Sequence, residues 1–294
     1  MKNIEKPSPV FLQKASVMRK NEQSSKPKLL VLVVLYKKMI SESPTITTLL
    51  LQHRDLFELE LVIWDNSPEK CPDAQIKDLE QRFGQFQYRW TPENTWLSKL
   101  YNQVLSARTY DYALLLDQDT DIPPYYFDKL SDALVQFPKI ALFLPLVLHK
   151  DKVVSPGSWV YFKGKHWNKI KTGILPAKNV LAITSGMVIA EKVFFEHKMK
   201  FDERLSLYGI DTGFMLNFSK FEKQLYVLPI KFDHDTVLWS NPSADVMLGR
   251  FRNLKSTWPK ILSDRPVARV LVYFYSMAVS FKLALKYQDL RFLK

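Results

Sequence analysis

The chain has 294 residues, of which 47% are hydrophobic and 24% are charged, a composition that excludes general disorder and suits one large α/β domain with an appendage. A single cysteine, Cys71, excludes an intrachain disulfide framework and makes a reducing compartment the expected location. The polar, charged N-terminus predicts no secretion signal. The longest uncharged apolar stretch near the C-terminus, residues 270–281, is shorter than the run of about twenty residues that a membrane span needs, so we expect no span.

The net charge of +12 is concentrated at the two ends of the chain. Residues 1–28 carry a net charge of +5 and residues 250–294 a net charge of +8, which leaves −1 for the middle. A nucleic-acid groove would carry a basic stripe across the fold, so we expect no nucleic-acid partner. Basic ends are typical of a domain held near an anionic surface, where each basic residue contributes about 1 kcal/mol. Tails that only aid solubility are the alternative.

The first 120 residues alternate strands and helices after a basic leader at residues 1–27. Apolar runs predict strands at residues 29–35, 59–64, 86–90 and 112–116. Helical spacing predicts helices at residues 44–56, 73–83 and 97–110. This alternation predicts an α/β fold with a mostly parallel central sheet and helices on both faces. The chain has no Gly-x-Gly-x-x-Gly sequence, so an ordinary dinucleotide-binding fold has little support.

The second half of the chain is less regular. We predict helices at residues 128–137, 192–197 and 212–221, and strands at residues 140–148, 187–190 and 225–230. Pro145 is expected to interrupt the first of these strands, and residues 150–180 are expected to be rich in loops. Apolar residues at helical spacing from Pro266 onwards predict an amphipathic helix. We therefore expect a main domain at residues 28–255 and a basic helical tail at residues 256–294.

Three carboxylates follow the predicted strand at residues 112–116. Asp117, Asp119 and Asp121 occupy alternate positions, directly before Pro-Pro. They lie at the carboxyl end of a buried strand, where open α/β sheets bind their ligands. Charges of one sign so close together repel one another unless a cation or a donor-rich ligand joins them. A hard divalent ion with oxygen ligands is the simplest candidate.

Several kinds of site share this pattern of acids. An EF-hand calcium loop begins in this way, but its required Gly and Glu are replaced by Ile122 and Asp128. A phosphatase of the haloacid dehalogenase type would place its nucleophile at Asp117, with Thr or Val at the position of Asp121. A solvated acidic turn is the alternative without chemistry. The Asp-x-Asp sequence also resembles that of nucleotide-sugar-dependent glycosyltransferases, in which Mg²⁺ or Mn²⁺ bridges the acid and the donor diphosphate.

The order of the surrounding motifs resembles that of an inverting family 2 glycosyltransferase with a GT-A fold, over residues 29–255. The strand that ends at Tyr36 resembles the family's first strand, and residues 63–67 (Ile-Trp-Asp-Asn-Ser) are similar to its Val-Asp-Asn-x-Ser. Asn94 and Asn102 match an Asn-x-Gly-x-x-x-Ala-x-Asn pattern, in which Trp96 replaces the Gly and Leu the Ala.

Further matches follow downstream. Ser185-Gly186 resembles the family's segment near the reaction centre, and the stretch from Phe201 to Asp211 is similar to the one that supplies the catalytic base. His234 stands where the family often has a metal-ligating histidine. An Arg-Asn pair at residues 252–253, together with the Asp-Gln-Asp form of the cluster, favours a rhamnosyltransferase-like subgroup.

The resemblance implies a role for each matching residue. Asp211 would be the catalytic base, which takes a proton from the acceptor hydroxyl. Mg²⁺ or Mn²⁺ would be held by Asp119, Asp117 and His234. The donor would bind against Tyr36, Asp65, Asn66, Asn94, Asn102, Asp117 and Gln118. The acceptor would lie near Ser185 and Gly186, and its sugar faces would stack on aromatic side chains such as Trp159, Tyr161, Trp167 and Trp239.

These residues also have ordinary structural roles open to them. Asp211 could cap the helix at residues 212–221, and Asp65 could form an Asx turn. His234 could be a solvated loop histidine, and Asn94 and Asn102 could cap and pack. Aromatic residues are more often core than ligand surface.

The sequence therefore predicts an inverting, metal-dependent transferase that moves a sugar from a nucleotide diphosphate to a glycan. The subgroup suggests dTDP-L-rhamnose as donor and bacterial surface polysaccharide, such as O-antigen, as product. The basic tail predicts a peripheral cytoplasmic enzyme, at the inner face of a bacterial membrane, with a polyprenyl-diphosphate-linked acceptor. Alternatives are a UDP-hexose or UDP-galactofuranose transferase, or a non-catalytic sugar-nucleotide-binding scaffold. The tail could instead pack on its own domain or on a second copy in a homo-oligomer.

Overall fold

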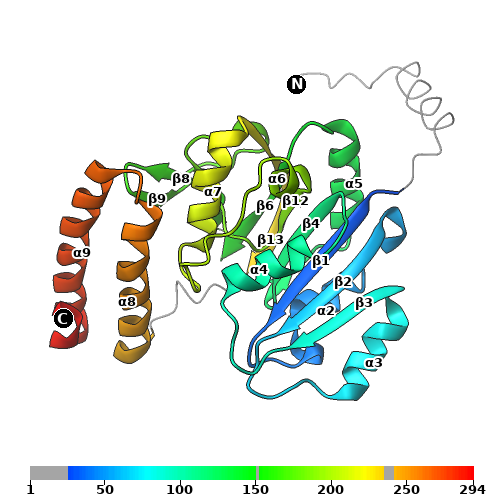
Figure 1. Ribbon diagram of the computed structural model, residues 1–294, viewed down its shortest axis with the longest axis horizontal. Helices are drawn as coiled ribbons and strands as arrows, with labels where there is room; N and C mark the ends of the chain where they lie inside the picture. Colours follow the sequence, from blue (N-terminus) through cyan, green and yellow to red (C-terminus); the bar gives the residue numbers. More distant parts are fainter. Residues whose placement is uncertain (1–25, 150–151, 235–241) are drawn as a thin grey trace, which may run out of the picture.

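The computed structural model describes residues 26–149, 152–234 and 242–294, which form an α/β domain followed by two long helices (Figure 1). The strands are β1 (Lys28–Leu35), β2 (Glu58–Asp65), β3 (Gln85–Trp90), β4 (Tyr112–Asp117), β5 (Thr120–Asp121), β6 (Leu142–His149), β7 (Lys152–Ser155), β8 (Gly157–Val160), β9 (Lys163–His166), β10 (Gly173–Pro176), β11 (Val180–Leu181), β12 (Met187–Ala190) and β13 (Gln224–His234). The helices are α2 (Pro44–Leu49), α3 (Asp73–Arg82), α4 (Leu97–Ser106), α5 (Tyr126–Gln136), α6 (Lys192–Phe195), α7 (Ile210–Phe221), α8 (Ala244–Ile261) and α9 (Pro266–Tyr287).

The central sheet has the strand order β10-β13-β6-β12-β4-β1-β2-β3. The four strands from the first half of the chain, β3, β2, β1 and β4, are parallel to one another, whereas β12 is antiparallel to both β4 and β6. Apolar side chains on both sides of β1 and β4 are buried, as a central parallel strand requires. The predicted α/β fold is therefore confirmed.

Helices cover both faces of the sheet. One apolar cluster joins the sheet to α4, α6 and α7, and a second joins its other face to α2, α3 and α5. This arrangement leaves the carboxyl ends of β1, β2 and β4 at a common edge, where the loops after them meet. The fold thus brings the predicted site residues of the first half of the chain to one end of the sheet.

Two expectations about the second half of the chain were wrong. Strand β6 runs through Pro145 without interruption, and the irregularity falls on its neighbour β13, where the register shifts between Val227 and Lys231. Residues 150–180 are not mainly loops, because β7 to β10 and the start of β11 lie there. Three of these short strands form a separate sheet in the order β11-β8-β9. Short strands rich in Gly and Lys lack the apolar alternation that identifies longer strands.

The tail forms an antiparallel pair of helices, α8 and α9, beside the main domain (Figure 1). The domain boundary that the sequence suggested at residue 255 falls inside α8. Helix α9 has a mean hydropathy of 1.4 over 18 residues, with 22% of that window buried, and within the described residues it is the one helix long and apolar enough to cross a membrane. Length and composition therefore do not exclude a span, contrary to the expectation from the uncharged run alone.

Candidate functional site

A cleft of about 590 Å³ lies at the carboxyl edge of β1, β2 and β4. It is lined by Val34, Tyr36, Asn66, Glu93, Asn94, Thr95, Trp96, Leu97, Asp117, Gln118, Asp119, Ser206, Leu207 and Asn253. Six of these residues were predicted to bind the donor or the metal, namely Tyr36, Asn66, Asn94, Asp117, Gln118 and Asp119. Strand pairing in the parallel sheet brings them together from four separate segments of the chain.

Gln118 fixes the floor of the cleft. Its side-chain oxygen accepts a hydrogen bond from Tyr36 N at 2.8 Å, and its amide nitrogen donates to Tyr36 O at 3.2 Å. This pair of bonds attaches the end of β1 to the turn after β4 and so holds the backbone of Tyr36 beside the turn that contains the aspartates. Gln118 therefore has a structural function alongside the donor-binding role predicted for it.

The backbone of the aspartate turn is held from below by buried hydroxyl groups. Thr45 Oγ1 donates to Asp117 O at 2.5 Å and accepts from Thr120 N at 2.9 Å. Ser185 Oγ accepts from Asp117 N at 3.2 Å and lies 2.8 Å from Thr120 Oγ1. Because Ser185 is buried and used in this way, the structure places it under the aspartates and outside the lining of the cleft.

Gly186 is a packing position. Its φ is +86°, and a Cβ there would lie 2.5 Å from Pro145 Cγ and 2.8 Å from Phe232. The close approach of these side chains from β6 and β13 requires glycine. Neither Ser185 nor Gly186 reaches the cleft lining in the structure, and their predicted contact with an acceptor stays a prediction.

Asp65 is fully buried behind the cleft. Its Oδ1 accepts from Ser67 N at 2.9 Å, and its Oδ2 accepts from the Tyr88 hydroxyl at 2.5 Å and from Cys71 N at 3.3 Å. The bond to Ser67 is the Asx turn that was the structural alternative for this residue. The neighbouring Asn66 lines the cleft in its place.

The two predicted asparagines have different positions. Asn94 is exposed in the cleft wall with a φ of +54°, a conformation that asparagine tolerates better than most residues. Asn102 lies outside the cleft, where its amide bonds both the N and the O of Phe201 at 2.9 Å. That bond attaches α4 to the segment that leads to Asp211, so packing, the alternative stated for Asn102, is what the structure shows.

Asp211 lies in the first turn of α7 and is not the helix cap. Gly209 occupies the N-cap position with a φ of +79°, and Asp211 Oδ1 accepts from Thr212 N at 2.7 Å. Burial raises the pKa of the Asp211 carboxyl above its ordinary value of 3.8, although the hydrogen bond from Thr212 acts in the opposite direction. A carboxyl whose charged form is poorly solvated is a stronger base than an exposed one.

Tyr101, on α4, connects Asp211 to the aspartate cluster. Burial is the main reason why the pKa of its phenol is raised, and the charges of Asp117 and Asp211 both raise it further. The same hydroxyl lies 3.4 Å from Thr184 Oγ1. The carboxylates of Asp117 and Asp211, almost a hundred residues apart in the sequence, therefore both influence the pKa of one phenol. Nothing in the sequence motifs marked Tyr101.

A model of the family described as "Glycosyl transferase family 2" matches residues 43–225, which is more than half of the chain. The chain belongs to glycosyl transferase family 2. No curated protein sequence is significantly similar to it.

Solved structures with the GT-A fold resemble this family 2 member along most of its length. The crystal structure of residues 1–349 of S. aureus TarS in complex with UDP-GlcNAc has a TM-score of 0.56 and 16% identity, over 76% of this chain and 64% of TarS 1–349. The structure of GalNAc-T7 with UDP, GalNAc and Mn²⁺ has a TM-score of 0.57 and 14% identity, over 90% of this chain and 55% of that chain. At this identity the likeness shows the fold. The chain spans less than two thirds of the length of each.

The oxygen ligands of the cleft suit a hard divalent ion. Asp117 and Asp119 both line it, and the backbone of His234 pairs with Thr120, which places the predicted histidine position opposite the cluster. Across residues 26–149, 152–234 and 242–294, no three His, Cys, Asp or Glu side chains converge on one point. Two carboxylates fit Mg²⁺ or Mn²⁺ if donor phosphate or water completes the shell, as these ions usually require.

The described aromatic residues predicted to bind the acceptor, Trp159, Tyr161 and Trp167, do not line the cleft. Tyr161 is exposed elsewhere, and Trp167 donates a hydrogen bond to Ser158 Oγ at 2.9 Å. Trp159 is buried and packs on Leu216, Leu262 and Val272 between the domain and the tail. It is therefore core, which was the stated alternative, and not part of the cleft. Trp239 lies outside the described residues.

Sequence reasoning missed several walls of the cleft. Trp96, 46% exposed, offers an aromatic surface there, and Lys99 lies over its ring. Ser206, Leu207 and Asn253 arrive from the loop before α7 and from α8. Ser206 and Leu207 belong to no motif, and the Arg-Asn pair that contains Asn253 was not predicted to reach the cleft, because only the packing of distant segments brings these residues there. That pair and the departure from glycine at Trp96 were the signals available in the sequence.

Proposed function

We propose that this chain transfers a sugar, with inversion, from a nucleotide diphosphate donor to a glycan hydroxyl. The observation that carries the proposal is the cleft at the carboxyl edge of β1, β2 and β4, where Asp117 and Asp119 lie beside Tyr36. Asp117, beside Asp119 in the open cleft, suits the donor side, and the poorly solvated Asp211 suits a base. Membership of family 2 supports the same assignment.

The chemistry of inversion gives these residues their proposed functions. Asp211 takes the proton from the acceptor hydroxyl as its oxygen attacks the anomeric carbon, and the bond from that carbon to the nucleotide diphosphate breaks. When bound, the divalent ion screens the negative charge that develops on the diphosphate. Asp117 and Asp119 hold that ion, and Tyr36, Asn66 and Asn94 position the nucleotide.

The donor we propose is dTDP-L-rhamnose, on the grounds of the Asp-Gln-Asp form of the cluster and the Arg-Asn pair at residues 252–253. Within that pair, Asn253 lines the cleft, where its amide donates to Ser206 Oγ at 3.2 Å. UDP-hexose and UDP-galactofuranose are the alternatives on the same fold. The TarS structure was solved with UDP-GlcNAc, and the GalNAc-T7 structure with UDP and GalNAc. These ligands support binding of a nucleotide sugar, and the donors named above should be compared directly.

The acceptor we propose is a lipid-linked glycan at the cytoplasmic face of a bacterial inner membrane, where surface polysaccharide is built. The net charge of +8 on residues 250–294 supports this location, because a polyprenyl diphosphate is itself anionic.

Asp211→Asn is the decisive test of the catalytic proposal. The amide keeps the size of the side chain but cannot accept the proton, so transfer should fall by roughly 10²–10⁴-fold while donor affinity stays within about twofold. Transfer would be measured as release of the nucleotide diphosphate, and donor affinity would be measured by calorimetry. Asp121→Asn, at an exposed position outside the cleft lining, is the matched control.

The same experiment separates an enzyme from a sugar-nucleotide-binding scaffold. A scaffold would bind donor and release no nucleotide, in the wild type as in the variant. Unchanged transfer by Asp211→Asn would contradict the base assignment. Thermal-shift screening of dTDP- and UDP-sugars with Mn²⁺ would identify the donor beforehand.

A further inference from the structure

The outer surface of α9 is not used by the proposed chemistry. Eight of its large apolar side chains are exposed, namely Val267, Val270, Leu271, Tyr273, Phe274, Met277, Phe281 and Leu285. Leu290 and Leu293, in the 3₁₀ turn that follows, are exposed as well. A continuous exposed apolar surface of this kind marks an interaction site in a soluble domain.

Protein covers a narrow stripe of α9. Val272, Ser276, Ser280 and Ala284, spaced four residues apart, are the buried residues of the helix. Val272 packs with Trp258 of α8, and Ala284 packs with Leu248 and Phe251 of the same helix. The half-buried Tyr275, Val279 and Leu283 flank this stripe and pack on the same clusters, whereas the exposed apolar side chains lie on the remaining surface of a helix at the edge of the molecule (Figure 1).

The charges on α9 are of one sign. Arg269, Lys282 and Lys286 are exposed, the helix contains no acid, and none of the three forms an ion pair with a described residue. Apolar side chains among unpaired cations suit an anionic lipid surface. A second copy of the chain docked through the same face would bring these cations together without an acid to pair them.

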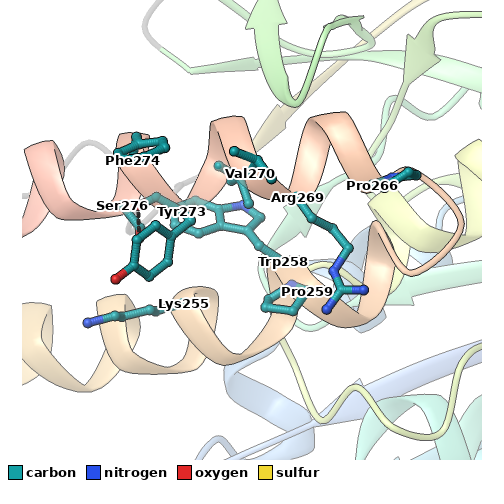
Figure 2. Close-up of a pocket in the computed structure, with 10 residues that line it drawn as sticks. Lys255, Trp258, Pro259, Pro266, Arg269, Val270, Tyr273, Phe274 and Ser276 are labelled. Carbon is teal, nitrogen blue, oxygen red and sulfur yellow. Dashed lines mark hydrogen bonds between the residues drawn. The ribbon is translucent and has the colours of Figure 1, made fainter.

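A groove of about 670 Å³ between α8 and α9 adds a second feature of the same kind. Its walls include Trp258 and Pro259 of α8 and Tyr273 of α9, and it is flanked by Lys255 on one helix and Arg269 on the other (Figure 2). An apolar channel flanked by two cations matches the chemistry of a lipid chain that ends in a phosphate.

The packing of the C-terminal end of α9 and the length of its uncharged run favour a helix in the membrane plane over a span. The C-terminal turn is fixed to the start of α8, because Arg291 pairs with Asp245 at 2.8 Å and Phe292 packs on Phe251. Between the cations Arg269 and Lys282, residues 270–281 cover about 18 Å at about 1.5 Å per residue, against about 30 Å of hydrocarbon. The serines of the covered stripe also remain against α8.

We infer that α9 lies in the plane of an anionic membrane surface, with its outer face among the lipids and with Lys255 and Arg269 on lipid phosphate. The inference deepens the proposed function, because a lipid-linked acceptor would be bound at that surface. Only this link to the acceptor rests on the proposed function. Helix α8 contributes Asn253 to the cleft and Lys255 to the groove, so the docked helix pair would hold the cleft beside the surface.

Flotation of the full chain with vesicles tests the inference. Vesicles of phosphatidylcholine with about 30% phosphatidylglycerol should carry the protein, and vesicles of pure phosphatidylcholine should carry much less. Phe274→Asp with Phe281→Asp should reduce binding roughly tenfold or more at an unchanged melting temperature, because both side chains are exposed. Val135→Asp, at an 80% exposed apolar position on α5, is the matched control.

A charge series tests the phosphate contacts. Lys255→Glu with Arg269→Glu should weaken binding to the anionic vesicles roughly tenfold and lower its salt dependence. Lys77→Glu, an exposed position on α3, should change binding by less than about twofold. Equal losses in the double variant and in this control would overturn the phosphate assignment, because total charge alone would then explain the binding.

The remaining outcomes decide against the inference in distinct ways. Wild-type binding by the Phe274 and Phe281 variant would overturn it, and resistance of the wild type to alkaline extraction would show a spanning helix. A dimer that the variant converts to a monomer, with vesicle binding unchanged, would show a subunit interface. Asp211→Asn should bind vesicles like the wild type, so failure of transfer and failure of docking are read separately.

Discussion

At the scale of single residues, the proposed base Asp211 lies in the first turn of α7, outside the residues that line the cleft. Its charge and that of Asp117 both raise the pKa of the Tyr101 phenol, although burial of the phenol is the larger cause. The raised pKa of Asp211 follows from burial, which disfavours the charged form. Burial of the charged Asp211 carboxylate therefore lowers the free energy of unfolding.

This destabilising effect gives a prediction about stability. The folded-state pKa of Asp211 is raised, so the stability it contributes is fully present below the unfolded-state pKa and is lost as the pH rises through the folded-state pKa. Asp211→Asn should therefore raise the melting temperature relative to wild type at about pH 8, and the difference should shrink towards about pH 3.5. Calorimetric melting across this range checks it. An equal difference at both ends would show that ionisation of Asp211 is not involved.

The same raised pKa predicts a pH dependence of activity. A base must be deprotonated to act, so kcat should decline on the acidic side with a midpoint above the ordinary carboxyl pKa of 3.8. Nucleotide release measured at saturating donor and acceptor across the acidic range would give the midpoint. A decline centred at or below the ordinary value would contradict the environment described for Asp211.

Asp65 illustrates a residue whose contacts are structural. Its buried carboxylate accepts from the Tyr88 hydroxyl, which also accepts from Cys71 N at 3.1 Å. Tyr88→Phe removes a hydrogen bond to a charged group, so the free energy of unfolding should fall by about 2 kcal/mol in urea denaturation. Tyr161→Phe, at an 82% exposed position, is the control and should change it by less than about 0.5 kcal/mol. Equal stabilities of the two variants would show that the bond contributes nothing.

At the scale of elements, the junction between α7 and α8 holds Asp211 in place. Gly209 precedes α7 in the left-handed region, and a Cβ there would lie 2.5 Å from Thr257 Cγ2 and 2.6 Å from Ile261 Cδ1 of α8. Backbone conformation and close helix packing therefore require glycine at the same position. The tail is thus packed against the start of α7, the helix that carries the proposed base.

Paired alanine substitutions test this junction. Gly209→Ala should lower the free energy of unfolding by about 2–3 kcal/mol and reduce kcat, because the start of α7 must move. Gly213→Ala, within the same helix, meets nothing nearer than Leu205 Cδ1 at 3.5 Å and should stabilise by up to about 1 kcal/mol. Urea denaturation of both variants measures the contrast. Similar effects in the two would show that α8 does not constrain Gly209.

At the scale of the whole molecule, donor binding should stabilise the fold through mass action. A donor at about 100 times its Kd adds about 2.7 kcal/mol, which is several degrees of melting temperature for a domain of this size. With Mn²⁺ this increment should be large, and EDTA should remove most of it. Asp119→Asn should have the effect of EDTA, whereas Asp121→Asn should retain the increment. Equal shifts with and without metal would contradict the metal assignment.

The strand and helix pattern of the first half of the domain was predictable because its signals are local. Four apolar runs of strand length alternate with helical spacing, and each run became the expected strand to within one residue at either end. The helix expected at residues 44–56 was wrong in its extent, because α2 ends at Leu49 and a separate 3₁₀ turn follows at Arg54–Leu56. The four-residue strands β9 (Lys-Gly-Lys-His) and β10 (Gly-Ile-Leu-Pro) were missed, because the stability of such short strands comes from neighbours in the sheet and not from their own composition.

The same division applies to the site. Asp117 and Asp119, which line the cleft, could be predicted as candidates because charged residues at strand ends stand out in a sequence, and the role of Asp211 stays a prediction. The roles of Ser185, Gly186 and Asn102 under and behind the cleft could not be predicted in this way, since a hydroxyl or an amide looks the same whether it faces a ligand or the protein interior. Trp96 and Asn253 were not predicted to line the cleft, because the packing of segments far apart in the chain brings them there.

By itself, the sequence determined the α/β fold, the first strands and the residues that follow them, because burial of apolar runs and repulsion between neighbouring carboxylates are properties of short segments. The tertiary structure alone decided that Asp211 and Asp117 act on the same phenol, that Asp65 is turned inward and that α9 keeps an open apolar face. Each of these depends on contacts between segments far apart in the chain, whose geometry is set by how the sheet and its helices pack.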